Sequence, residues 1–153
     1  MRCLLQRVKS SSVSVDGKSV GKSGAGYLIL FGAGPEDNEA VAAALAKKTV
    51  NLRVFSDDEG KMNKSLLDIG GEALIVSQFT LYADCKRGNR PSFIGACKPD
   101  RANELYELFC RRVEEYGIHV ERGEFGADMQ VSLINDGPVT IMLDSDEIVK
   151  KPK

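Results

Sequence analysis

An apolar run, Ala73–Val76, continues directly into the more polar stretch Ser77–Ala83. A short run of apolar and β-branched residues is typical of a buried strand. Polar side chains that follow at the end of such a strand need hydrogen-bond partners. If the strand continues, its period of two places Gln78, Thr80 and Tyr82 on one face. The pattern leaves two interpretations open: a strand end whose hydroxyl groups are satisfied by neighbouring backbone, or a functional site at the mouth of a sheet.

Several other segments have the composition of strands. Leu4–Val15 is strand-like, and the Asp16-Gly17 pair that follows it is typical of a type I′ hairpin turn. The dense run Tyr27–Phe31 is consistent with a fully buried central strand. Shorter strands are predicted at Val54–Phe55, Ile118–Arg122, Asp128–Ile134 and Val139–Leu143, with Asn135–Pro138 as the turn between the last two.

Two segments have the apolar spacing of amphipathic helices. Asp37 is predicted to cap the first helix, which runs from Ala40 to about Asn51. The second is predicted to run from near Asp100 to Tyr116. Strands and helices together indicate an α+β (mixed α/β) fold, rich in strands, in which mixed sheets pack with two main helices.

Length and hydropathy restrict the class of protein. A chain of 153 residues is within the range of one domain, and we predict a single domain at residues 1–149 followed by a basic tail at residues 150–153. No apolar run approaches the roughly 18 residues of a membrane span. The first residues are interrupted by Gln6 and Arg7, which a secretory signal would not contain. We therefore expect a cytoplasmic protein without a membrane partner.

The cysteines give no sign of a metal or disulfide site. Cys3, Cys85, Cys97 and Cys110 are scattered without any paired spacing, which argues against a zinc site and a disulfide framework. We predict reduced thiols with packing roles, and neither a metal nor another cofactor. The only histidine, His119, lies between Ile and Val, without a nucleophile close to it in the sequence. A Ser-His-Asp series and a phosphate-binding glycine loop are also missing from the sequence.

The segment Asp84–Arg101 is predicted to be a basic loop. It contains five basic residues and two acidic ones, whereas the whole chain has a net charge of −1. Nucleic-acid binding would therefore depend on a local patch of this kind. Lys86, Arg87 and Arg90 are the candidate phosphate contacts. The alternative interpretation is a solvated loop without a ligand.

Five motifs together resemble the D-aminoacyl-tRNA deacylase family. They are Gln6-Arg7-Val8, Gly60-Lys61-Met62-Asn63, Ser77–Ala83, Gly88-Asn89-Arg90-Pro91-Ser92-Phe93 and Asn135-Asp136-Gly137-Pro138-Val139-Thr140. They occur in the family's order and extend over nearly the whole chain. Ser77-Gln78-Phe79-Thr80 resembles the D-specific branch, since a sister branch that edits a misplaced L-amino acid has Pro-Gln-Ala-Thr here.

The resemblance implies a barrel-like fold and a homodimer with active sites at the subunit interface. It implies hydrolysis of the ester between the terminal adenosine of tRNA and a D-amino acid or glycine, with no role for DNA. Ser77, Gln78, Phe79 and Thr80 would form the catalytic segment. Chiral selectivity would come from a cis Gly137-Pro138 bond that reaches into the partner's pocket, from Arg7, which braces the incoming turn, and from Met129.

Physical arguments fit this arrangement. A pocket that accepts many D side chains must test chirality at Cα, and a rigid backbone wall excludes the L form whatever the side chain is. Backbone N–H groups around Ser77 to Phe79 would stabilise the developing oxyanion. Thr80 is a candidate nucleophile, but no adjacent base is evident, and the family's ribose 2′-hydroxyl is the alternative means of activating water. A non-catalytic RNA-binding module and a purely structural dimer are the other functions that the sequence allows.

Overall fold

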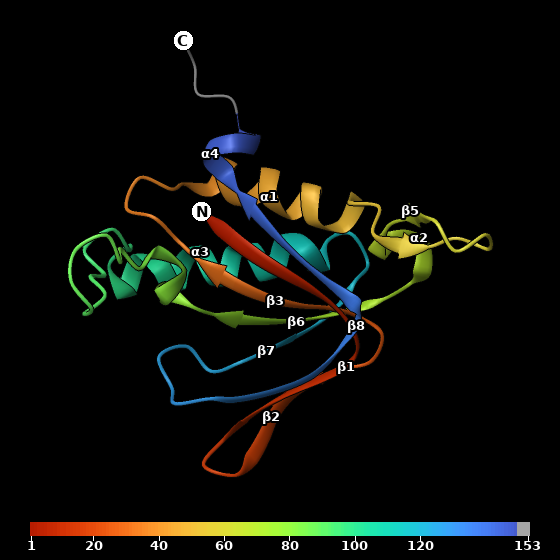
Figure 1. Ribbon diagram of the computed structural model, residues 1–153, viewed down its shortest axis with the longest axis horizontal. Helices are drawn as coiled ribbons and strands as arrows, with labels where there is room; N and C mark the ends of the chain where they lie inside the picture. The colour runs from red at the N-terminus through yellow and green to blue at the C-terminus, as the bar shows by residue number, and fades with distance from the viewer. Residues whose placement is uncertain (150–153) are drawn as a thin grey trace.

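The computed structural model describes residues 1–149, and its sheet is assembled around the long strand β1 (Arg2–Val15). One edge of β1 pairs antiparallel with β3 (Gly26–Gly32) and then with β2 (Lys18–Ser23). The other edge pairs antiparallel with β8 (Gln130–Asp144) along nearly its whole length. This arrangement leaves β8 at the edge of the sheet (Figure 1).

The sheet is mixed and curls into a barrel-like shape. β6 (Glu72–Ser77) pairs in parallel with β3, and β7 (His119–Arg122) pairs in parallel with β6. A Cβ atom added to Gly21 in β2 would lie 2.6 Å from the carbonyl oxygen of Arg122 in β7, so the two distant strands nearly touch. The predicted α+β class and the barrel-like arrangement are confirmed.

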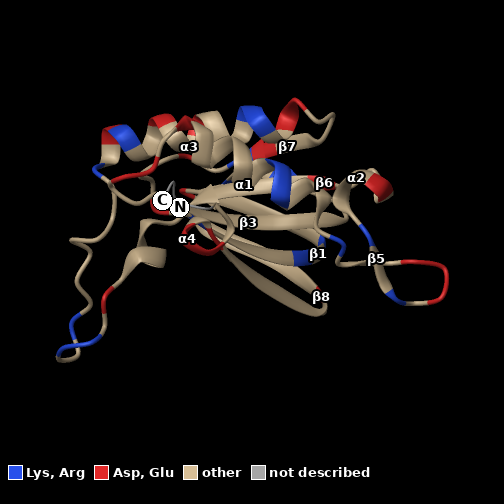
Figure 2. Cartoon of the chain, turned by 90° about the horizontal axis from the view of Figure 1, so that it is seen from above, with Lys and Arg blue, Asp and Glu red and all other residues tan. Residues whose placement is uncertain are grey.

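Two main helices, α1 (Glu39–Asn51) and α3 (Pro99–Glu114), cover one face of the sheet (Figures 1 and 2). Two further helices, α2 (Leu66–Ile69) and α4 (Ser145–Ile148), are single turns. The short strands β4 (Phe55–Ser56) and β5 (Met62–Lys64) form a hairpin that projects from one end of the molecule. Among residues 1–149, no helix is long and apolar enough to cross a membrane.

The central strand β3 is buried on both faces, as its dense apolar composition predicted. Tyr27, Ile29 and Phe31 belong to the core beneath the helices. Leu28 and Leu30 point the other way, into the barrel, where they pack with a second apolar cluster. Strands covered on both faces read as continuous apolar runs, which accounts for the sequence pattern.

Two local predictions were wrong. Asn38, not Asp37, caps α1: its side chain accepts a hydrogen bond from the Val41 amide at 3.0 Å, while Asp37 accepts one from the Gly34 amide at 2.7 Å. The cysteines do not all have packing roles, because Cys3, Cys97 and Cys110 are buried but Cys85 is exposed. The predicted basic tail, 150–153, lies outside the described residues.

Candidate active site

Strand β6 ends at Ser77, and the chain then turns into a short 3₁₀ helix, η1 (Phe79–Tyr82). The prediction of a continued strand with alternating faces was therefore wrong. The Gln78 amide still donates to the Phe31 carbonyl oxygen at 2.6 Å, but β3 ends at Gly32 and offers no further partner. A Cβ atom at Gly32 would lie 3.0 Å from the Gln78 carbonyl oxygen, so the chain folds closely over the end of β3.

The turn presents polar groups outward. Gln78 donates from Nε2 to Thr80 Oγ1 at 2.5 Å, which links two of the predicted catalytic residues. The amides of Phe79 and Thr80 open the helical turn, where N–H groups have no acceptor within a helix. Phe79 as a whole is 55% exposed. Since the two amides have no acceptor in the turn, they are candidates to donate to a bound group.

A cavity of about 600 Å³ lies beside this turn. Ser77, Gln78 and Phe79 line one side of it, and Met129 also lines it, together with Phe125. Thr80 does not line the cavity, although its hydroxyl group is held by Gln78. The structure thus brings four of the predicted site residues to one place.

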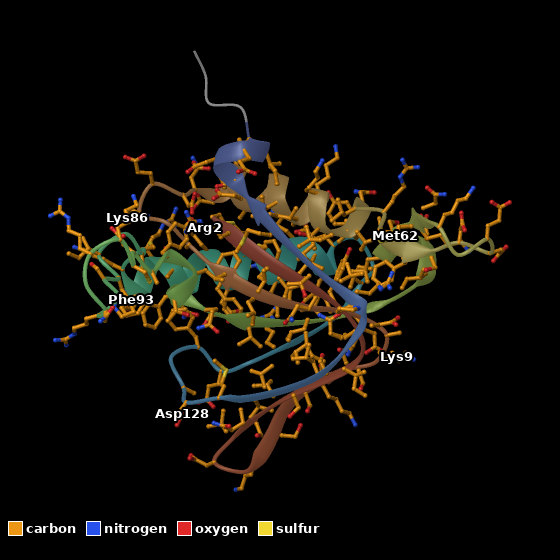
Figure 3. All side chains as sticks on the ribbon, viewed as in Figure 1. Arg2, Lys9, Met62, Lys86, Phe93 and Asp128 are labelled. Atoms are coloured by element: carbon orange, nitrogen blue, oxygen red, sulfur yellow. The ribbon has the colours of Figure 1, made fainter. Side chains whose placement is uncertain are left out.

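The rim of the cavity is aromatic. Phe79 and Phe93 meet edge to face with their ring centroids 5.0 Å apart, and the neighbouring Ile94 is 91% exposed. Phe93 and Asp128 lie at the same end of the molecule and both line the cavity (Figure 3). Sequence reasoning missed Phe125 and Asp128 as cavity residues, because they lie in the loop between β7 and β8, whose position depends on the tertiary fold.

Three titratable side chains line the cavity, those of Cys97, Lys98 and Asp128. Burial raises the pKa of the Cys97 thiol, which lines the cavity, so the thiol stays protonated at neutral pH. His119 does not line the cavity: it is exposed, pairs with Glu72 at the start of β6, and lies 3.4 Å from Glu121 on the same strand. In the part of the chain that the structure describes, no group of three or more His, Cys, Asp or Glu residues is placed to hold a metal ion.

The predicted Asn135–Pro138 turn is a bulge inside one continuous strand, β8. The register of β1 and β8 shifts at Arg7, because the residues on either side of Arg7 pair with Thr140 and Asn135. Four residues of β8, 136–139, therefore lie opposite a single residue of β1. A bulge of this size displaces the backbone away from the sheet.

The bulge carries Gly137 and Pro138, joined by the expected cis peptide bond. Both residues are exposed. Gly137 has a φ of +130°, a conformation that favours glycine. Asn135 stabilises the bulge, because its Oδ1 accepts a hydrogen bond from the Val139 amide at 2.8 Å.

Arg7 holds this bulge from the same chain. Its Nε donates to the Asp136 carbonyl oxygen at 2.8 Å, and its Nη1 donates to the Val54 carbonyl oxygen at 2.7 Å. The side chain of Arg7 is only 11% exposed. The resemblance implies that Arg7 braces the partner's incoming turn; within one chain, its hydrogen bonds hold its own bulge.

The bulge lies far from the cavity of its own chain. Arg7 pairs with Tyr27 at the start of β3, whereas the cavity is lined by Phe31 at the end of that strand. Four residues of strand correspond to about 13 Å. Lys9, two residues after Arg7, lies at the opposite end of the molecule from Phe93 and Asp128 (Figure 3). One chain therefore does not bring Gly137 and Pro138 into its own cavity.

Lys86, Arg87 and Arg90 are exposed on the loop that follows η1. Figure 2 shows the basic tip of this loop projecting away from the helices. Within residues 1–149, no ion pair engages these three side chains. Arg101, at the end of the predicted loop, lies in α3 and pairs with Glu39 and Glu104, each at 3.0 Å.

Comparisons with known proteins agree over the length of the chain. A family model described as D-Tyr-tRNA(Tyr) deacylase matches residues 4–144. A D-aminoacyl-tRNA deacylase of Roseiflexus castenholzii (strain DSM 13941 / HLO8) is 58% identical over 153 residues, which are 100% of this chain and 97% of that protein. One of Thermosipho africanus (strain TCF52B) is 56% identical over 148 residues, covering 97% of this chain and 99% of that protein.

Two solved structures share the fold. One, described as c-Myc DNA Unwinding Element Binding Protein, has a TM-score of 0.88 at 38% identity and covers 94% of this chain and 98% of that chain. The other, described as a probable eukaryotic D-amino acid tRNA deacylase, has a TM-score of 0.79 at 20% identity, with 93% and 97% covered. At 20% identity the second likeness concerns the fold alone.

Proposed function

Because the chain belongs to the D-Tyr-tRNA(Tyr) deacylase family, we propose that it cleaves the ester bond of D-aminoacyl-tRNA and releases free tRNA and a D-amino acid. It is then a carboxylic ester hydrolase that removes wrongly charged amino acids before translation uses them. The observation that carries this proposal is the match to named deacylases over nearly the whole chain. The cavity beside Ser77, Gln78 and Phe79 is the place for the ester.

Backbone amides at the start of η1 would stabilise the tetrahedral intermediate. The N–H groups of Phe79 and Thr80 have no acceptor within the helical turn and can donate to the developing oxyanion. One such donor contributes roughly 2.7–4 kcal/mol in other enzymes. Gln78 would orient the Thr80 hydroxyl, to which it donates a hydrogen bond, and through it the substrate or water.

Activation of water would come from the ribose 2′-hydroxyl of the RNA. Ser77, Gln78 and Phe79 of the predicted catalytic segment line the cavity and none of them is a base, and burial raises the pKa of the Cys97 thiol; Asp128 lines the cavity from the loop between β7 and β8, outside that segment. A threonine nucleophile needs an adjacent base, and the group hydrogen-bonded to Thr80 is an amide, which is not one. This chemistry needs no metal or other cofactor.

Chiral selectivity would come from Gly137 and Pro138 of the second subunit of a homodimer. The bulge is exposed and too far from its own cavity to line it, which supports insertion into the partner's cavity. Arg7 would stiffen this wall through its hydrogen bond to Asp136. A wall of backbone excludes the L side chain by contact and leaves the D direction open.

Glycine would pass the same test. A wall that rejects a side chain on one side of Cα has nothing to reject in glycine, so glycyl-tRNA would be a substrate as well. The aromatic rim of the cavity supports acceptance of varied apolar groups rather than one specific side chain.

The tRNA would approach along the basic loop. Lys86, Arg87 and Arg90 have no ion pair within residues 1–149 and lie on the loop that follows η1, so they can contact phosphates near the 3′ end. We expect action in the cytoplasm, where charged tRNA is used, and no specific binding of DNA. Competition of duplex DNA with charged tRNA at one salt concentration tests the last point.

Parallel deacylation of D-tyrosyl-, L-tyrosyl- and glycyl-tRNA tests the activity. Release from the D and glycyl substrates, with the L substrate spared, is the expected result. Equal hydrolysis of both tyrosyl forms would refute selectivity. Salt-sensitive tRNA binding without any hydrolysis would favour a non-catalytic RNA-binding module instead.

A mixture of two variants, each expected to lower the hydrolysis of D-tyrosyl-tRNA on its own, tests the shared site. One subunit carries Gln78→Ala and the other carries Pro138→Ala. If each site combines groups from both chains, every mixed dimer has one intact site, and random mixing restores about a quarter of the wild-type activity. A site contained in one chain gives no restoration, and a monomer in sedimentation would contradict the dimer directly.

A further inference from the structure

The η1 turn is held by one arginine near the N-terminus, in β1. Nη1 of Arg2 donates a hydrogen bond to the Leu81 carbonyl oxygen at 2.8 Å. Among residues 1–149, this is the one hydrogen bond from a side chain to the backbone of residues 79–82. Leu81 is the residue after Thr80, so the contact is next in sequence to the proposed oxyanion donors.

The guanidinium of Arg2 is itself fixed on two further sides. Its Nε lies 3.1 Å from Asp144 Oδ2, and its Cζ lies 4.6 Å from the centroid of the Tyr82 ring. The planar guanidinium presents its donors at fixed angles, which allows simultaneous contact with a carboxylate, a carbonyl group and a ring face. In Figure 3, Arg2 and the exposed rim residue Phe93 lie in the same half of the molecule.

A turn of this length needs such support. A 3₁₀ helix of four residues has few internal hydrogen bonds, and those have poor geometry. The orientation of η1 therefore depends on contacts from outside. Arg2 also pairs in the sheet with Gly32, which lines the cavity, so it connects a strand that lines the cavity to the turn.

We propose that Arg2 is a positioning residue for ester hydrolysis. It holds Leu81, and through it fixes the η1 turn whose first amides, those of Phe79 and Thr80, are the proposed oxyanion donors, without touching the substrate. The inference rests on the proposed function, since it assigns Arg2 to that same site. A displacement of catalytic groups by about 1 Å can cost up to about 100-fold in rate.

Kinetics of Arg2→Ala and Arg2→Lys test the proposal. For Arg2→Ala we expect kcat on D-tyrosyl-tRNA to fall about 10- to 100-fold while KM changes less than about twofold. Arg2→Lys should be intermediate, because an ammonium group can reach Leu81 or Asp144 but lacks the planar fork. Arg112→Ala is the matched control: Arg112 pairs with Glu115 near the far end of α3 and should keep wild-type kcat.

Hydrogen exchange gives a readout that does not depend on activity. Amides of residues 79–83 should exchange faster in Arg2→Ala than in wild type, while those of α1 and α3 stay unchanged. Wild-type kcat in Arg2→Ala, or unchanged exchange in η1, would overturn the role of Arg2 while leaving the proposed function intact. If Arg2→Ala does not fold, the same two measurements on Arg2→Lys decide.

The wild-type protein separates the two hypotheses. If it does not hydrolyse D-tyrosyl-tRNA at all, the proposed function fails, and the role of Arg2 in hydrolysis fails with it. If wild type is active and Arg2→Lys matches it in both kcat and η1 exchange, only the inference about Arg2 fails.

Discussion

Arg7 donates a hydrogen bond from Nε to the carbonyl oxygen of Asp136 at 2.8 Å, although the two residues are 129 positions apart. Nη1 of the same side chain reaches the Val54 carbonyl oxygen at 2.7 Å. One nearly buried guanidinium thus joins the base of the β4–β5 hairpin to the bulge that carries Gly137 and Pro138.

Arg7→Ala should loosen this bulge and reduce chiral selectivity. Hydrogen bonds from charged groups contribute about 1.5–3 kcal/mol each, so the free energy of unfolding should fall by at least that amount. We expect the ratio of D- to L-tyrosyl-tRNA hydrolysis to fall as well. Urea denaturation and paired deacylation assays measure the two effects. A variant that loses stability but keeps the wild-type ratio would show that Arg7 supports the fold alone.

Gly137→Ala should reduce D-specific hydrolysis more than a substitution of a glycine outside the site. The new Cβ would lie 2.7 Å from Arg7 Nη2 and 3.0 Å from Val139 Cγ2, at a φ of +130°. Backbone strain of this kind costs about 1–3 kcal/mol, and the clash displaces Arg7 or the wall. Loss of most D-specific activity is the expected result.

Gly17→Ala is the matched control for this prediction. Gly17 also has a positive φ, +77°, but a Cβ there meets no atom within 4 Å. The Gly17→Ala variant should have a lower free energy of unfolding, because its backbone is strained in a similar way, but it should still hydrolyse D-tyrosyl-tRNA. Equal loss of activity in both variants would mean that the effect is general destabilisation.

Thr80→Ala should weaken turnover without abolishing it. The Thr80 hydroxyl group accepts a hydrogen bond from Gln78 and does not line the cavity, so its loss frees Gln78 but removes no oxyanion donor. We expect a fall of kcat of about tenfold or less, since a single neutral hydrogen bond contributes about 0.5–1.5 kcal/mol. An inactive Thr80→Ala enzyme that still binds tRNA would support a threonine nucleophile.

Replacement of Lys86, Arg87 and Arg90 by alanine should weaken tRNA binding through charge alone. Each cation that no longer neutralises a phosphate should make the slope of log K against log salt less steep by about 0.7–0.9. The triple variant should therefore bind charged and uncharged tRNA more weakly and with a smaller salt dependence. Lys18→Ala, on the exposed β1–β2 hairpin, is the control. An unchanged salt slope in the triple variant would place the RNA elsewhere.

The sequence predicted the elements whose composition decides their structure. The buried run Tyr27–Phe31 became the central strand because it is covered on both faces. The helix predicted from Ala40 to about Asn51 was found at Glu39–Asn51. For Ser77–Ala83 the predicted strand was not found. A strand continues only where a neighbouring strand continues beside it, and β3 ends at Gly32.

The assembly of the site was only partly predictable. A motif in the chain pointed to Ser77, Gln78 and Phe79, and the family resemblance implied Met129; the fold brings all four to one cavity. No motif indicated that Asp136–Val139 would be a bulge, since that depends on its register with β1. The role proposed for Arg2 likewise depends on a contact across 79 residues, which no local pattern encodes.

Asp144 should make stability sensitive to acid. Partial burial alone would raise the pKa of its carboxyl group. Hydrogen bonds from the Asp146 amide and from Arg2 lower the pKa by more than burial raises it, so the pKa in the folded protein is below the usual value. The unfolded state, with a pKa of about 3.9, then binds more protons than the folded state. The stabilisation is present above about pH 4 and is lost as pH falls through the lower folded pKa.

Asp144→Asn should show a smaller loss of unfolding free energy between pH 5 and about pH 2 in urea titrations, as should Arg2→Ala. Parallel pH profiles for both variants and wild type would contradict the role of this ion pair.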